Sequence, residues 1–192
     1  MTNTRIPVLP TAILLFALGF GGRVVLHDYH NFETVMVSVF LAAMLLPATM
    51  ALIVTLSIMI LSDLYLGYFG VSKILFFTYT GFVLVSLVSS KFKDKIGGGF
   101  SSGTMYKFTS SGIIFALIYD TWTNFGVFWI NYNHTIENLF LVYALGLPFM
   151  LYHILSSVMT FSLVGFPVYC ALRNQKSSLD IEPQNQELET KN

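Results

Sequence analysis

The sequence predicts an all-α membrane protein, a bundle of six transmembrane helices with both termini in the cytoplasm. Hydrophobic residues make up 55% of the 192-residue chain and charged residues only 10%, whereas ordinary globular domains carry about 25% charged residues. The apolar stretches are long and continuous, unlike the alternating strands of a membrane barrel. Each span needs roughly 20 apolar residues, so a chain of this length has room for one compact bundle. This composition excludes a soluble domain.

Breaks in apolarity divide the chain into its expected helices, of about residues 8–26, 34–46, 48–62, 72–90, 108–130 and 138–172. The first could mimic a signal peptide, but no small-residue cleavage site follows and the rest of the chain is itself apolar, so we interpret it as the first span. The second and third are short and meet at Leu46 and Pro47 with no charged residue between them. A single kinked helix is therefore an alternative to two spans there.

Positive charge sets the orientation of the fourth, fifth and sixth helices. Four lysines between residues 91 and 107 flank one connection, and Arg173 and Lys176 follow the last helix. The positive-inside rule places both groups in the cytoplasm. Arg5 can share that side only if four spans precede Lys91, which favours a break at Pro47 and six spans in total.

The last predicted helix is too long for one straight span at 1.5 Å per residue. Gly146, Leu147 and Pro148 interrupt it about a third of the way along, so we expect a kink there. Beyond it, residues 174–192 are polar and lack an apolar face, which predicts a disordered cytoplasmic tail. The expected domains are thus a transmembrane domain over 1–173 and a tail over 174–192.

In this topology most polar residues fall in the three outer connections, at about residues 23–33, 63–72 and 131–138. Polar groups above an aromatic-rich bundle are typical of a small-molecule pocket that opens outward. The alternative is that these segments are simply solvated loops.

Asp120 lies near the middle of the fifth span, where an ionised carboxylate facing lipid would be costly, so it should face the bundle interior. Asn124 is one turn further on the same face, and Trp129 stands on another. These residues could surround a ligand. Alternatively, Asp120 and Asn124 tie helices together by hydrogen bonds, with His153 as a candidate partner of Asp120, and Trp129 anchors the interface.

Two further groups near the first connection allow more than one interpretation. Arg23 could hold a ligand carboxylate or phosphate, or extend to the membrane interface. His27 and His30 have a spacing that could place two imidazoles on one metal, completed by Asp28, Glu33 or His134, although loop hydrogen bonding explains them as well. We expect no metal and no other cofactor.

Enzyme motifs are missing from the sequence: there is no His-Glu-x-x-His, no Gly-x-Ser-x-Gly and no phosphate-binding glycine-lysine loop. We therefore expect a protein that is not an enzyme. A membrane enzyme would need the histidines and acids to converge on one metal or nucleophile. The formal net charge is zero, which argues against nucleic acid as a partner.

Four short motifs resemble those of the substrate-binding S components of energy-coupling-factor (ECF) transporters, in an uncharacterised branch of that superfamily. They are Arg23 to Phe32 ending in His30-Asn31-Phe32, Ser62-Asp63-Leu64-Tyr65-Leu66-Gly67, Thr123-Asn124-Phe125-Gly126-Val127-Phe128-Trp129, and Gly146-Leu147-Pro148-Phe149.

The resemblance implies a six-helix fold in a prokaryotic plasma membrane that captures a vitamin or similar micronutrient from the outer side. It also implies a partner, a membrane coupling subunit with two ATPases, on which the S component topples to deliver its substrate. The predicted substrate-binding residues are Asp63, Asp120, Asn124 and Trp129, followed by Arg23 and Asn31. The alternative function is a non-transport membrane scaffold or assembly protein.

Overall fold

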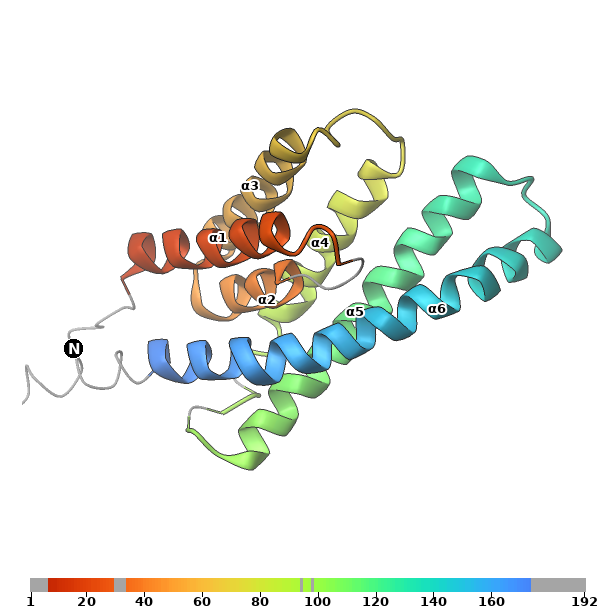
Figure 1. Cartoon of the computed structure of the whole chain (residues 1–192). Helices are drawn as coiled ribbons and strands as arrows, with labels where there is room; N and C mark the ends of the chain where they lie inside the picture. Colours follow the sequence, from red (N-terminus) through yellow and green to blue (C-terminus); the bar gives the residue numbers. More distant parts are fainter. Residues whose placement is uncertain (1–6, 30–33, 94, 98, 174–192) are drawn as a thin grey trace, which may run out of the picture.

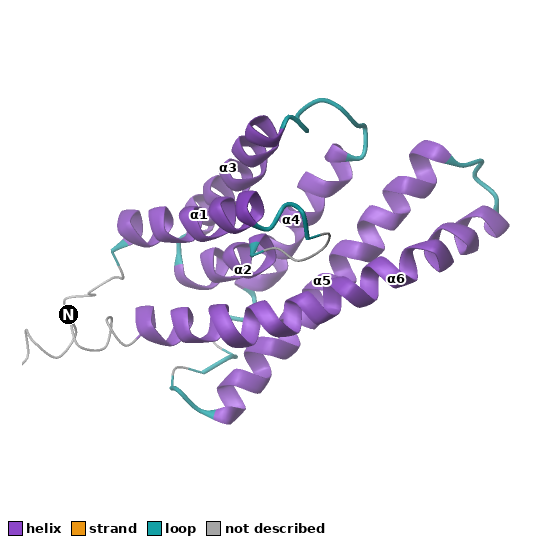
Figure 2. Ribbon diagram, viewed as in Figure 1, coloured by secondary structure: helices purple, strands orange, loops and turns teal. Residues whose placement is uncertain are grey.

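The protein is entirely helical over the residues that its computed structural model describes, 7–29, 34–93, 95–97 and 99–173 (Figures 1 and 2). Within these ranges there is no strand, which confirms the predicted class. The elements are α1 (Val8–Val25), α2 (Val35–Leu45), α3 (Ala48–Leu66), α4 (Leu75–Ser90), α5 (Ser102–Asn131), α6 (Ile136–Thr160) and a π-helical turn, η1 (Phe161–Gly165).

Four of the described helices are long and apolar enough to cross a membrane, which supports the membrane class predicted from composition. They are α1, α3, α5 and the continuous 38-residue helix Ile136–Arg173 that contains α6 and η1. The helices α2 and α4 are apolar but shorter.

The break predicted at Pro47 is present, so the kinked-helix alternative is wrong. Leu46 has an extended backbone conformation (φ −101°, ψ 163°), as the residue before a proline prefers, and α3 begins directly after Pro47. The end of α3 differs from the predicted end at residue 62. α3 runs on to Leu66 and ends at Gly67, whose positive φ of 76° closes the helix.

The helix α5 begins at Ser102, six residues before the predicted start at 108. The side chain of Ser101 accepts a hydrogen bond from the Thr104 backbone N–H and so caps the helix. The last helix is continuous through Pro148 and passes into a π-helical turn at η1, while the kink expected at Gly146–Pro148 stays a prediction.

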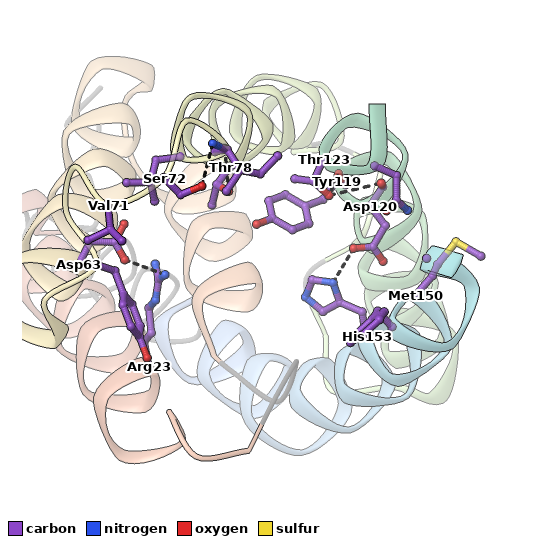
Figure 3. A pocket seen from close by; sticks show the side chains of 16 residues that line it. Arg23, Asp63, Val71, Ser72, Thr78, Tyr119, Asp120, Thr123, Met150 and His153 are labelled. Atoms are coloured by element: carbon purple, nitrogen blue, oxygen red, sulfur yellow. Dashed lines mark hydrogen bonds and ion pairs between the residues drawn. The ribbon is translucent and has the colours of Figure 1, made fainter. Parts of the chain in front are cut away.

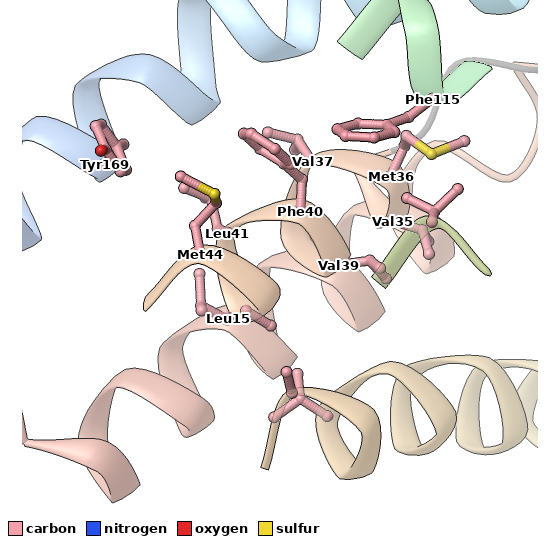
Figure 4. Packing of buried hydrophobic residues seen from close by; sticks show 14 of the residues in the cluster. Leu15, Val35, Met36, Val37, Val39, Phe40, Leu41, Met44, Phe115 and Tyr169 are labelled. Atoms are coloured by element: carbon pink, nitrogen blue, oxygen red, sulfur yellow. The ribbon is translucent and has the colours of Figure 1, made fainter. Parts of the chain in front are cut away.

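The helix α2 forms the centre of the bundle (Figure 4). Every residue from Val35 to Met44 is buried, because α1, α3, α4, α5, α6 and η1 all contact this helix. A helix that is apolar on all sides, as α2 is, can be surrounded in this way. At its middle, the Phe40 ring lies 4.9 to 5.3 Å from the rings of Phe108, Phe115 and Phe161.

Successive helices alternate in direction, so their connections gather at two ends (Figure 1). The α3–α4 and α5–α6 connections lie at one end, and the α4–α5 connection lies with the end of the described chain at the other. At this second end, Lys93 Nζ donates to the Leu46 carbonyl over 2.7 Å. Tyr169 and Arg173 both donate to the Gly97 carbonyl. These bonds tie the basic connection to the end of α2 and to the last helix.

Candidate functional site: a pocket between the two halves of the bundle

A pocket of about 510 Å³ lies between the α1–α3–α4 side of the bundle and the α5–α6 hairpin (Figure 3). The C-terminal turns of α1 and α3, the first turn of α4, and the middle of α5 and α6 form its walls. The α3–α4 connection closes part of it through Tyr68, Val71 and Ser72. The volume falls within the range of small-molecule sites, about 300–1,000 Å³.

One wall carries a buried charge network that joins three helices. Arg23 Nη2, at the end of α1, lies 2.8 Å from Asp63 Oδ1 at the end of α3. The Tyr79 hydroxyl of α4 donates to the second carboxylate oxygen over 2.7 Å, and Arg23 also approaches Met59 Sδ at 3.1 Å. The Asp63 side chain is fully buried, so these donors compensate the cost of removing its charge from water.

The opposite wall carries a second buried pair, between α5 and α6. His153 Nδ1 lies 2.8 Å from Asp120 Oδ1, so the interior position predicted for Asp120 is confirmed. The other oxygen, Asp120 Oδ2, is buried and has no hydrogen-bond partner in the part of the chain that the structure describes. The ring of Tyr119 meets His153 edge-on at a centroid distance of 5.5 Å, and Figure 3 shows it projecting between the two charge pairs.

Asn124 lines the pocket one helical turn beyond Asp120. Gly146 of α6 lies directly against it, since a Cβ at Gly146 would stand 2.6 Å from the Asn124 amide. Only a glycine there allows the two helices to approach so closely. No hydrogen bond to the Asn124 side chain occurs within the described ranges, so the amide has donors and an acceptor to offer a ligand.

The structure brings four of the six sequence-predicted site residues to this pocket: Arg23, Asp63, Asp120 and Asn124. Trp129 is not among the lining residues. It is 54% exposed near the tip of the α5–α6 hairpin, where it stacks on the His134 ring at 4.3 Å. Asn31 lies outside the described residues.

Sequence reasoning missed the contribution of α4. Thr78 lines the pocket, and Tyr79 holds Asp63, yet neither was predicted as a site residue. Both are polar residues in the first turns of an otherwise apolar helix, directly after the predicted outer connection at 63–72. Their position beside that connection is the feature of the sequence that could have indicated a role in the site.

The described residues do not form the metal site that the spacing of His27 and His30 suggested. Among the described residues, no group of three or more His, Cys, Asp or Glu side chains is arranged to hold a metal ion. His27 Nδ1 lies 3.3 Å from the exposed Asp28 carboxylate, while His30 and Glu33 lie outside the described residues.

Comparison with known proteins gives one family and no individual relative. Neither the curated proteins nor the solved structures contain a match to this chain. One family model, described as a family of unknown function (DUF6580), matches residues 1–181. Because that match spans nearly the whole sequence, the chain belongs to the DUF6580 family.

Proposed function

We propose that this protein is the substrate-capture subunit of a micronutrient uptake transporter, similar to an ECF S component, and that its ligand binds in the pocket described above. The observation that carries the proposal is the convergence of Arg23, Asp63, Asp120 and Asn124, from three helices, on one pocket of about 510 Å³. Polar groups that converge in a partly apolar pocket favour small-molecule binding over a purely structural role.

The orientation of the pocket also supports capture from outside. The pocket lies at the end of the bundle opposite the basic α4–α5 connection. With that connection in the cytoplasm, the pocket faces outward and both termini are cytoplasmic. This topology makes α2 and α4 the two additional spans. Because α2 is enclosed by its neighbours, its short length exposes little polar backbone to lipid.

Energy for uptake has to come from a partner in this proposal. The sequence carries no nucleotide-binding motif, so a membrane coupling subunit with two ATPases would power transport, in a prokaryotic plasma membrane. A solitary S-type protein that works without a dedicated module is compatible with the same pocket.

A thermal-shift screen tests the proposal directly. The detergent-purified protein is heated in the presence of single vitamins, nucleobase derivatives and corrinoids. A ligand that binds only the folded state stabilises it by about 4 kcal/mol at a thousandfold excess over its dissociation constant. We expect a large shift with one compound. A flat screen on folded, monodisperse protein would contradict the proposal.

The Asn124→Leu variant tests whether the hit binds in this pocket, because it removes the amide while keeping the number and branching of the side-chain heavy atoms. We expect it to fold and to lose the ligand-induced shift. Asn131→Leu is the matched control, since Asn131 is exposed at the end of the same helix and does not line the pocket.

The rival function is a membrane scaffold, and the number of polar contacts between helices favours it as the second candidate. Besides the two charge pairs, Trp122 donates to Thr80, and Thr109 is bonded to Ser162. Such contacts join transmembrane helices without any ligand. Under this function no compound shifts the melting temperature, and Asn124→Leu lowers the stability of the unliganded protein.

A further inference from the structure

We propose that the pocket selects a ligand with N–H donors, on a cationic or amino-substituted ring, and discriminates against carboxylates and phosphates. This inference rests on the proposed function, whose site it shares. It differs from one of the two interpretations of Arg23 that the sequence allowed, in which the guanidinium holds a ligand carboxylate or phosphate.

The charges on the walls of the pocket do not favour an anion. The ionisable side chains lining the pocket are Arg23, Asp63, Asp120 and His153, together with the tyrosines Tyr68 and Tyr119. If His153 is neutral, the two carboxylates outweigh the guanidinium, and if it is protonated the charges cancel. In neither state do the described lining residues carry a net positive charge, so an anion gains no attraction from them.

Arg23 is already engaged by a buried carboxylate. Its guanidinium contacts Asp63 Oδ1 at 2.8 Å, and that carboxylate is completely buried. An acidic ligand that drew Arg23 away would leave Asp63 as an uncompensated buried charge, which is strongly unfavourable. The structure therefore gives Arg23 the role of holding Asp63 at the wall.

One oxygen of Asp120, Oδ2, is buried and has no hydrogen-bond partner among the described residues. The residue is 8% exposed, and His153 occupies the other oxygen, Oδ1. A buried acceptor without a donor is unfavourable, so a ligand N–H gains a charge-assisted bond once the carboxylate turns Oδ2 toward the pocket. Asn124, one turn away on the same face, offers a carbonyl oxygen to a second N–H and an amide to a ring nitrogen.

Aromatic and apolar side chains around the pocket favour a flat ligand. Figure 3 shows the Tyr119 ring between the two charge pairs, and Leu75, Phe149 and Met150 supply apolar surface around it. A flat ring can lie against such side chains while its edge meets Asp120 and Asn124. The combination fits an amino- or amidine-bearing aromatic ring.

Three probes of equal size test this inference: benzamidine (cation), benzamide (neutral) and benzoate (anion). Their affinities for the full-length protein in nanodiscs are measured by saturation-transfer NMR at millimolar concentration. We expect benzamidine to bind at least about tenfold more tightly than benzoate, with benzamide between them. Asp120→Asn should remove this preference, whereas Asp120→Glu, which keeps the charge, should retain part of it.

Asp28→Asn is the matched control, because Asp28 is 82% exposed beside His27 and does not line the pocket. Benzoate binding as tightly as benzamidine would overturn the inference, as would a benzamidine preference that persists in Asp120→Asn. If Asp120→Asn does not fold, the inference is tested by the order of the three probe affinities in the native protein and in Asp120→Glu. Absence of benzamidine binding also overturns this inference, while a hit in the micronutrient screen would leave the proposed function standing.

Discussion

Asp63 depends on donors from two neighbouring helices, since its carboxylate is fully buried in the last turn of α3. Arg23 holds one oxygen and Tyr79 the other. Removing one partner of such a pair is far more costly than replacing both, because the remaining charge is left without compensation. The stability of this pocket wall therefore depends on both Arg23 and Asp63, which are 40 positions apart in the sequence.

We expect Arg23→Met to destabilise the protein by about 3 kcal/mol for this reason. The double variant Arg23→Met/Asp63→Leu should be less destabilised than the sum of the two single variants, because it leaves no buried charge behind. Thermal unfolding in one detergent measures all four proteins as a double-mutant cycle. Additive effects would mean that the two side chains do not interact.

Trp129 gives a second test of the site at the level of single side chains. It stacks on His134 and does not line the pocket. We expect Trp129→Ala to leave the affinity for a screened ligand unchanged within about twofold, whereas Asn124→Leu abolishes binding. A titration of both variants compares them, and a large loss in Trp129→Ala would extend the site to the hairpin tip.

Single residues in apolar segments were the most informative part of the sequence. Asp120 in a spanning segment had to face inward, and it does, because an ionised group facing lipid is too costly. Its contact with His153 could be suggested but not fixed, since the rotation of α6 about its axis decides it. The sequence could not place Trp129, which lies outside the lining of this pocket, because an amphipathic aromatic ring suits a pocket and a membrane interface equally well.

Close packing of α5 against its neighbours depends on glycine at particular positions along the helix. A Cβ at Gly112 would stand 2.6 Å from the ring of Phe161, which is fully buried in η1 and has no room to move. At Gly126, a Cβ would come within 2.3 Å of Phe77 on α4. The first contact sets the spacing between α5 and the last helix, and the second sets the spacing between α5 and α4.

We expect Gly112→Ala to destabilise the protein by about 1–3 kcal/mol through overpacking against Phe161. Gly103→Ala in the same helix is the matched control, because nothing lies within 4 Å of its Cβ position. There the gain in helix propensity should leave stability unchanged or raise it by up to about 1 kcal/mol. Equal melting temperatures for the two variants would show that the α5–η1 contact is loose.

The apolar stretches predicted which segments are helical, and the distribution of positive charge predicted the break at Pro47. The ends of the helices and their packing could not be predicted in this way. The start of α5 at Ser102 depends on a cap that looks like an ordinary polar loop in the sequence. Apolarity on all sides of α2 indicated burial by lipid or by protein equally well. Only the tertiary arrangement shows that protein encloses it.

The molecule as a whole divides into a pocket end and a basic end, and this division makes the topology testable. We expect a cysteine at Val71, which is 75% exposed in the α3–α4 connection, to react with a membrane-impermeant maleimide in intact cells. A cysteine at Phe100, which is equally exposed in the α4–α5 connection, should react only after the membrane is opened. Both are placed in a Cys170→Ser background, because Cys170 is the sole native cysteine. The reverse labelling pattern would place the pocket on the cytoplasmic side.

The proposed function requires that a ligand binds in the pocket. Calorimetric titration of the best compound from the screen tests this binding most directly. The native protein and Asn131→Leu should each bind one molecule of that compound per chain, and Asn124→Leu should bind none while remaining folded. Equal affinity in all three proteins, or no binding by the native protein, would contradict the account and favour a scaffold whose polar residues only join its helices.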